Sequence, residues 1–152
     1  MQVPALTGAV AASRKVPAHV KAHTTGRWAE IILRALSSRA ANRWRFVSFR
    51  GEGHGEWRGV VDVLAIRKNT SAPGSARLKR GDLFEIILVQ IKGGSARSPT
   101  RDDCLRLREV ARHYKAKAVI QFQWRKSVSS KFFELDHKTL TWIPTTGTKV
   151  FG

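Results

Sequence analysis

Two apolar stretches decide the fold: residues 59–66 read Gly-Val-Val-Asp-Val-Leu-Ala-Ile, and residues 83–92 read Leu-Phe-Glu-Ile-Ile-Leu-Val-Gln-Ile-Lys. Nearly continuous apolar runs of this length are typical of strands in a sheet that is covered on both faces. Polar residues interrupt both runs, namely Asp62 in the first and Gln90 and Lys92 at the end of the second. Because side chains alternate along a strand, Gln90 and Lys92 are expected to project from the same face.

The periodicity of apolar residues predicts further elements on both sides of these two strands. They are a helix that residues 24–26 cap and that runs to about residue 41, a strand over 44–50, a helix over 99–114, a strand over 117–124 and a terminal hairpin formed by 132–135 and 140–143. Residues 69–81, which include Pro73 and Gly74, are expected to form an exposed loop. This order of helices and strands predicts an α/β domain with a central mixed β-sheet flanked by helices.

The charge of the chain points to its class of partner. The chain has 152 residues, enough for one domain with its own core, and carries 28 Lys and Arg against 11 Asp and Glu, a formal net charge of +17. Such an excess attracts nucleic acid, because each neutralised phosphate releases a condensed counterion. A basic protein without a dedicated partner is the alternative. A membrane surface is not expected, since the charges are spread along the whole chain rather than gathered on one amphipathic helix.

The ends and the single cysteine set further limits. Residues 1–25 are small, basic and interrupted by proline, so they are interpreted as a flexible basic arm or as a plain disordered terminus, ahead of a domain over 26–152. The lone Cys104 excludes an intramolecular disulfide framework and a multi-cysteine zinc site, and it is expected to be packed. No secretory signal and no membrane-spanning run is recognised, so a cytoplasmic, nucleoid-associated location is expected.

Asp62, Gln90 and Lys92 are costly to bury singly, so their place in apolar strands indicates a shared site. A carboxylate, an amide oxygen and an ammonium group together suit phosphodiester hydrolysis with Mg²⁺ or Mn²⁺. Asp62 would ligate the metal, Gln90 would assist through its carbonyl oxygen, and Lys92 would orient the attacking water or stabilise the phosphorus centre. The structural alternatives are Asp62 as an ordinary strand-end residue and Lys92 as a lysine whose stem covers the strand end.

Three short patterns lie on the first predicted helix and on the two apolar strands: Gly26-x-x-x-Glu30, Gly59-x-x-Asp62 and Gln90-x-Lys92. With the order of elements over residues 26–124, they resemble the PD-(D/E)xK nuclease superfamily, and within it most of all the archaeal-type Holliday junction resolvases. The resemblance implies a restriction-endonuclease-like domain that cleaves DNA in recombination or repair. It also implies catalytic roles for Glu30, Asp62, Gln90 and Lys92, with Glu30, Asp62 and Gln90 as ligands of one or two divalent metal ions.

The same resemblance implies a homodimer whose two sites cut opposed strands of a four-way DNA junction. The chain departs from the family pattern at two positions. Val61 stands where the family usually has proline, and Gln90 stands where it usually has an acid, which removes a negative charge from the metal site. Glutamine occurs at the second position in some active members.

Two interpretations are open for Glu30. The apolar residues that recur at helical spacing in the first helix are expected to form its buried stripe; they are Trp28, Ile31, Ile32, Ala35 and Leu36. Glu30 falls away from this stripe, so a solvent-facing glutamate fits the pattern as well as a metal ligand does. Glu52 and Glu56, just ahead of Asp62, are the alternatives for that ligand.

The second predicted helix and its flanks are rich in cations that are expected to follow a phosphate backbone. The residues expected to bind nucleic acid are Arg97, Arg101, Arg108, Arg112 and Lys115. An ordinary solvated helix face is the alternative for each of them singly.

The sequence thus favours a metal-dependent DNA endonuclease that acts on branched or duplex DNA, with selectivity for branched DNA implied by the resemblance alone. Two other functions fit the sequence: a catalytically silent DNA-binding module of the same fold, and a basic RNA-binding protein without an active site. Adjacent motif strands, with Asp62 beside Gln90, would argue against the RNA-binding alternative.

Overall fold

The computed structural model describes residues 31, 33, 35, 43–49, 59–93, 97–125 and 128–152, and of residues 128 and 129 only the backbone. Its elements are β1 (Arg45–Ser48), β2 (Val63–Lys68), β3 (Phe84–Gly93), α2 (Arg101–His113), β4 (Ala118–Arg125), β5 (Val128–Asp136), β6 (Thr141–Thr145) and α3 (Gly147–Phe151). Ile31, Leu33 and Ala35 have helical backbone conformation. The predicted order of elements is confirmed in these parts of the chain, and α3 is an addition that the periodicity did not predict.

The strands form one six-stranded sheet in which spatial order follows chain order, from β1 to β6. Every neighbouring pair is antiparallel except β3 and β4, which are parallel and are joined through α2. A parallel pair needs such a crossover, whereas antiparallel pairs can be joined by short turns. The prediction of an α/β protein with a mixed sheet is therefore confirmed.

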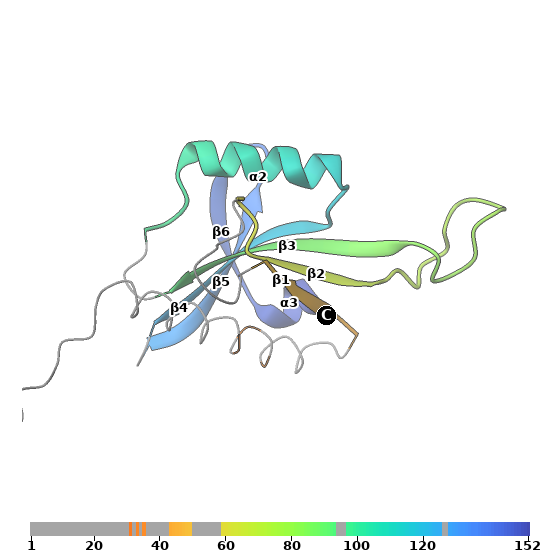
Figure 1. Ribbon diagram of the computed structural model, residues 1–152, viewed down its shortest axis with the longest axis horizontal. Helices are drawn as coiled ribbons and strands as arrows, with labels where there is room; N and C mark the ends of the chain where they lie inside the picture. The colour runs from red at the N-terminus through yellow and green to blue at the C-terminus, as the bar shows by residue number, and fades with distance from the viewer. Residues whose placement is uncertain are drawn as a thin grey trace, which may run out of the picture.

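Strand β3 is buried on both faces, which explains why its sequence is almost continuously apolar. Ile87, Val89 and Ile91 belong to one buried cluster, and Leu88 belongs to another on the opposite face. In Figure 1, α2 covers one face of the sheet, and α3 with the C-terminal end lies on the other. The core therefore has two layers with β3 between them.

The face opposite α2 is closed by the C-terminal helix. Phe151 is fully buried, and its carbonyl accepts a hydrogen bond from Trp44 Nε1 at 2.9 Å. The guanidinium of Arg67 lies 4.4 Å from the centre of the Trp44 ring, where a cation–π contact is favourable. These contacts tie α3 to Trp44, just before β1, and Trp44 in turn to Arg67 of β2, so residues of α3 complete the core.

The predicted buried stripe of the first helix is wrong at the positions that the structure describes. Leu33 is fully buried, whereas Ile31 and Ala35 are exposed. Residues 31–33 are all apolar, so helical spacing alone could not select which of them faces the core. Trp28, Ile32 and Leu36 lie outside the described residues.

Helix α2 packs as its sequence predicts. Cys104, Leu107 and Ala111 are buried against the sheet, and Leu105 and Val110 are half-buried beside them. The predicted packing of Cys104 is thus confirmed, and burial raises the pKa of its thiol. None of the helices in the described part of the chain combines the length and the apolar character that crossing a bilayer requires.

A capping box starts α2. Thr100 Oγ accepts from the Asp103 backbone N–H at 3.2 Å, and Asp103 Oδ2 accepts from the Thr100 backbone N–H at 3.1 Å. This second hydrogen bond is the main reason why the pKa of Asp103 is lower than its ordinary value, and the positive charges of Lys92 and Arg106 lower it further. Ionised Asp103 therefore stabilises the fold above its ordinary pKa, and the contribution is lost as the pH falls through the lowered value.

Replacing Asp103 with asparagine tests this contribution. Asp103→Asn should reduce the free energy of unfolding by about 0.5 kcal/mol at neutral pH, because a negative charge at a helix N-terminus is lost. The deficit should disappear as the pH falls through the lowered pKa of Asp103, because the wild-type carboxylate is then protonated as well. Urea unfolding of the wild type and the variant at several pH values measures this difference in the free energy of unfolding. Asp102→Asn, which removes the same charge from the same helical turn without a bond to Thr100, should cost less. A deficit that does not depend on pH would contradict the account.

Candidate functional site

The structure brings Asp62 together with the end of β3. Asp62 lies just before β2, and its backbone N–H donates to the Val89 carbonyl at 3.1 Å. Its carboxylate Oδ2 accepts from the Ile91 backbone N–H at 2.7 Å. Asp62 is thus bonded to both chain neighbours of Gln90, on strands that pair in antiparallel register. Its side chain also has a structural task, because it satisfies a backbone donor where regular β2 pairing ends.

Gln90 and Lys92 lie on the α2 side of the sheet. They follow Leu88 at intervals of two residues, and Leu88 packs in the cluster beneath α2. Gln90 is only 6% exposed, and its Oε1 has no hydrogen-bond partner among the described residues. A buried carbonyl oxygen without a partner costs about 1–3 kcal/mol, so such an atom suits a donor or cation that arrives from elsewhere.

The parallel strand β4 adds polar side chains that sequence reasoning missed. In the register of the sheet, Gln121 lies opposite Gln90, and Gln123 lies between Lys92 and Lys131. These side chains occupy the α2 side, because Val119 on the same strand packs beneath α2. The sequence signal was present, since Gln121 and Gln123 alternate with apolar residues as Gln90 and Lys92 do. Only the register, however, places the two segments side by side.

Gln90 and Gln121, the two glutamines at paired positions of β3 and β4, are both buried. Gln121 is 1% exposed, and its Nε2 lacks a hydrogen-bond partner within the described part of the chain. Two adjacent strands therefore each present a buried amide with one unsatisfied atom at paired positions. Such groups are rare in folded proteins, and their occurrence side by side marks this end of the sheet as a candidate polar site.

The N-terminal end of α2 borders the same site. The positive charge of Lys92 contributes to the lowered pKa of Asp103 in the first turn of α2, after the larger effect of the Thr100 backbone hydrogen bond. Lys92 itself is half-buried. Lys92 thus lies close enough to the start of α2 for its charge to act on Asp103.

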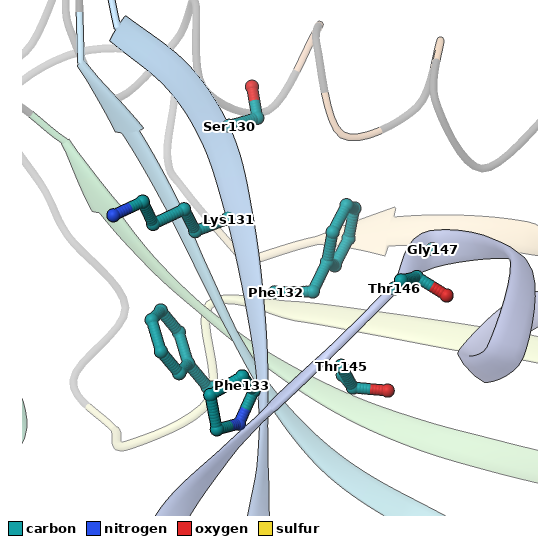
Figure 2. Close-up of a pocket in the computed structure, with 8 residues that line it drawn as sticks. Ser130, Lys131, Phe132, Phe133, Thr145, Thr146 and Gly147 are labelled. Atoms are coloured by element: carbon teal, nitrogen blue, oxygen red, sulfur yellow. The ribbon is translucent and has the colours of Figure 1, made fainter.

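An open hollow lies one strand further along, on β5 and β6. It is lined by Ser130, Lys131, Phe132, Phe133, Pro144, Thr145, Thr146 and Gly147. Figure 2 shows Lys131 and Phe133 on one side of β5 and Phe132 on the other. Lys131 therefore belongs both to this hollow and to the row that contains Lys92 and Gln123. No carboxylate, imidazole or thiol is among these lining residues, so the hollow by itself does not offer the usual protein ligands of a metal ion.

The remaining predicted metal ligands are not placed. Glu30, Glu52 and Glu56 lie outside the described residues. Within the described residues, three or more histidine, cysteine, aspartate or glutamate side chains do not gather in one place. Of the predicted metal ligands, the described structure thus contains the Asp62 carboxylate and the Gln90 amide oxygen.

The predicted nucleic-acid contacts lie on or beside the exposed surface of α2. Arg97, Arg101, Arg112 and Lys115 are exposed, whereas Arg108 is half-buried. Glu109 forms ion pairs with Arg108 at 3.4 Å and with Arg112 at 3.2 Å. Exposed pairs of this kind are weak, so the two arginines stay able to exchange Glu109 for a phosphate.

No protein-family model, no curated protein and no solved structure matches this chain.

The structural task of Asp62 can be separated from any chemical one. Asp62→Ala leaves the Ile91 backbone N–H without its acceptor and should reduce the free energy of unfolding by about 1–3 kcal/mol. Asp62→Asn retains a side-chain oxygen for this bond and should stay close to the wild type. Urea unfolding of the three proteins makes the comparison. Equal losses in both variants would show that the charge, and not the hydrogen bond, is what stabilises the fold.

Proposed function

We propose that this chain is a metal-dependent DNA endonuclease of the PD-(D/E)xK type. The observation that carries the proposal is the Asp62 carboxylate, hydrogen-bonded to Ile91 at 2.7 Å and so held directly beside Gln90 and Lys92. An acid just before β2, and an amide and an ammonium group from the neighbouring strand β3, then lie at the same end of the sheet. This adjacency argues against an RNA-binding protein without an active site.

The topology supports the same proposal. Strands β1, β2 and β3 form an antiparallel series, and α2 then leads to β4, parallel to β3. A restriction-endonuclease-like domain is what the resemblance of the sequence implies, and this order of strands and helix agrees with it. The helical conformation of Ile31, Leu33 and Ala35 ahead of β1 is consistent with the first helix of such a domain.

The donor set suits a hard divalent cation. Mg²⁺ and Mn²⁺ prefer oxygen ligands. The unsatisfied Gln90 Oε1 is a buried oxygen, and its residue precedes Ile91, whose backbone N–H binds the Asp62 carboxylate. Asp62 and Gln90 would hold the ion, and one of Glu30, Glu52 and Glu56 would complete the set. When bound, such an ion supplies Lewis acidity toward a phosphate and lowers the pKa of a water molecule.

Lys92 would act on the DNA itself. An ammonium group on the same face as Gln90 can donate hydrogen bonds to a phosphate oxygen and balance negative charge that develops during cleavage. It can also orient a water molecule against the phosphorus. Gln123, which is half-buried on the neighbouring strand β4, extends this row of polar side chains and would contact the adjacent DNA backbone.

The charges of the chain would supply affinity. Arg101, Arg108 and Arg112 are spaced seven and four residues apart, so they follow one side of α2 as a line of cations. This line begins near the candidate site and continues away from it. Contacts with phosphates position DNA without reading its sequence, so sequence-independent binding is proposed. A homodimer that selects branched DNA is proposed from the resemblance alone.

Cleavage by the wild type and by Asp62→Asn tests the proposed function. The wild type should cut DNA with Mg²⁺ or Mn²⁺ and not with EDTA, whereas Asp62→Asn should abolish cutting and keep or improve DNA affinity, because repulsion between carboxylate and phosphate is removed. Substrates are junction, flap, duplex and single-stranded DNA. Asp102→Asn, an equal change of charge on the exposed surface of α2, should cut normally.

The alternatives give different results in the same assay. Cutting by Asp62→Asn at the wild-type rate would refute the proposed site. Binding without cutting by the wild type, on every substrate and with both metals, would leave a catalytically silent DNA-binding module. Duplex that displaces labelled junction as well as unlabelled junction does would remove the selectivity for branched DNA.

Gln90→Glu tests the metal without relying on activity. A buried carboxylate is costly when it lacks a cation, so the melting temperature in EDTA should fall below that of the wild type. Mn²⁺ should then raise it by more than it raises the wild type, because the added charge strengthens metal binding. Gln121→Glu is the matched control, with an equally buried amide one strand further from Asp62. Equal responses to Mn²⁺ in both variants would place the metal away from Gln90.

A further inference from the structure

The segment between β2 and β3 projects from the body of the protein. In Figure 1 it extends beyond the sheet, at the end of the β2–β3 pair, as the yellow-to-green loop. It comprises residues 69–83, well beyond the loops of about two to five residues that usually connect antiparallel strands. Most of its residues are exposed, and the predicted exposed loop over 69–81 is thus confirmed. Long loops of this kind are commonly functional.

The projection has a defined internal structure. At its base, the Asn69 backbone N–H donates to the Leu83 carbonyl at 2.8 Å, and the Gly81 N–H donates to the Asn69 carbonyl at 3.1 Å. Nearer the tip, the Leu78 N–H donates to the Ser75 carbonyl at 3.2 Å. Gly81 has a φ of +89°, which only glycine adopts without strain. The loop therefore presents its side chains from an organised backbone.

The cations of the loop are available to a partner. Arg77, Lys79 and Arg80 are exposed, and none of them forms an ion pair with a described residue. The one acid of the segment, Asp82, accepts from the Lys79 backbone N–H at 2.7 Å and so is used within the loop. Leu78, between two of the cations, is an exposed apolar side chain. Cations that flank an apolar tip suit a DNA groove, where phosphates line both sides.

We infer that residues 69–83 form a second DNA-contact element, separate from the candidate active site; the inference rests on the proposed function. Residues 62–68 and 84–90 each span about 20 Å at about 3.3 Å per residue, so the loop begins about 20 Å from Asp62 and Gln90. That distance corresponds to about six base pairs of duplex at about 3.4 Å each. The loop holds the DNA arm that leads away from the cut.

Helix α2 extends from the candidate active site toward the end of the sheet that bears the loop. Its N-terminal end borders Lys92, and beyond its C-terminal end the Lys117 backbone N–H donates to Ile86, near the start of β3. The line of cations on α2 therefore runs from the site toward the end of the sheet that bears the loop (Figure 1). An anionic membrane fits less well, because the exposed apolar side chains of the loop are few and do not form an amphipathic helix.

A triple variant tests the inference. Arg77→Ala/Lys79→Ala/Arg80→Ala should weaken binding to a labelled duplex of about 20 base pairs by roughly 10- to 100-fold, with a log–log salt slope that is smaller by about two to three. Fluorescence anisotropy in EDTA measures affinity whether or not the chain cleaves. Arg45→Ala/Lys138→Ala/Lys149→Ala removes the same charge from exposed positions outside the loop and α2 and should weaken binding far less. Equal losses, or no loss in the loop variant, would overturn the inference.

A shortened hairpin provides a second variant. Replacing residues 69–83 with Asn-Gly joins the paired residues Lys68 and Phe84 by a two-residue turn, and it should reproduce the loss of affinity with an unchanged melting temperature. The inference would be overturned if this variant bound DNA with wild-type affinity. It would also be overturned if the variant lost binding to phosphatidylserine vesicles while its DNA affinity stayed intact. At saturating protein, both loop variants should cleave at the wild-type single-turnover rate. Failure of the proposed function would give a different result. The wild type would then not cleave DNA, although its DNA affinity would still depend on the loop.

Discussion

Burial of β3 on both faces is the constraint on which the rest of the structure depends. A strand with Ile87 and Val89 on one side and Leu88 on the other exposes apolar surface in both directions unless each face is covered. Helix α2 covers one face, and α3 with Leu33 covers the other. The parallel partner β4 follows from the same need, because the crossover that carries α2 over the sheet returns the chain in the direction of β3.

The candidate site lies where this double cover ends. On the α2 side of β3, apolar side chains are followed toward the C-terminal end of the strand by Gln90 and Lys92. On β4, they are followed in the same way by Gln121 and Gln123. Regular β2 pairing stops at Asp62, which satisfies the Ile91 backbone donor with its side chain. Polar groups therefore lie together at this end of the core, and some of them lack hydrogen-bond partners. Proteins commonly bind ions and substrates in such an environment.

The cations of α2 and of the projecting loop lie outside the packed core. Arg101 and Arg112 on α2, and Arg77 and Arg80 on the projecting loop, lie outside the packed layers, where cations keep their hydration and cost little. The fold therefore separates two tasks. A partly buried set of few groups is available for chemistry, and an extended exposed set is available for long-range attraction of a polyanion.

The sequence by itself determined the order of elements, the mixed sheet and the exposed loop over 69–81, because alternation, helical spacing and glycine–proline content act over short stretches. It also singled out Asp62, Gln90 and Lys92 as polar residues in apolar strands. Only the tertiary structure decided which of Ile31 and Leu33 faces the core, that the C-terminal helix closes it, and that Gln121 lies opposite Gln90. Those features depend on register and on contacts between segments far apart in the chain, such as Trp44 with Phe151, and local periodicity carries no information about either.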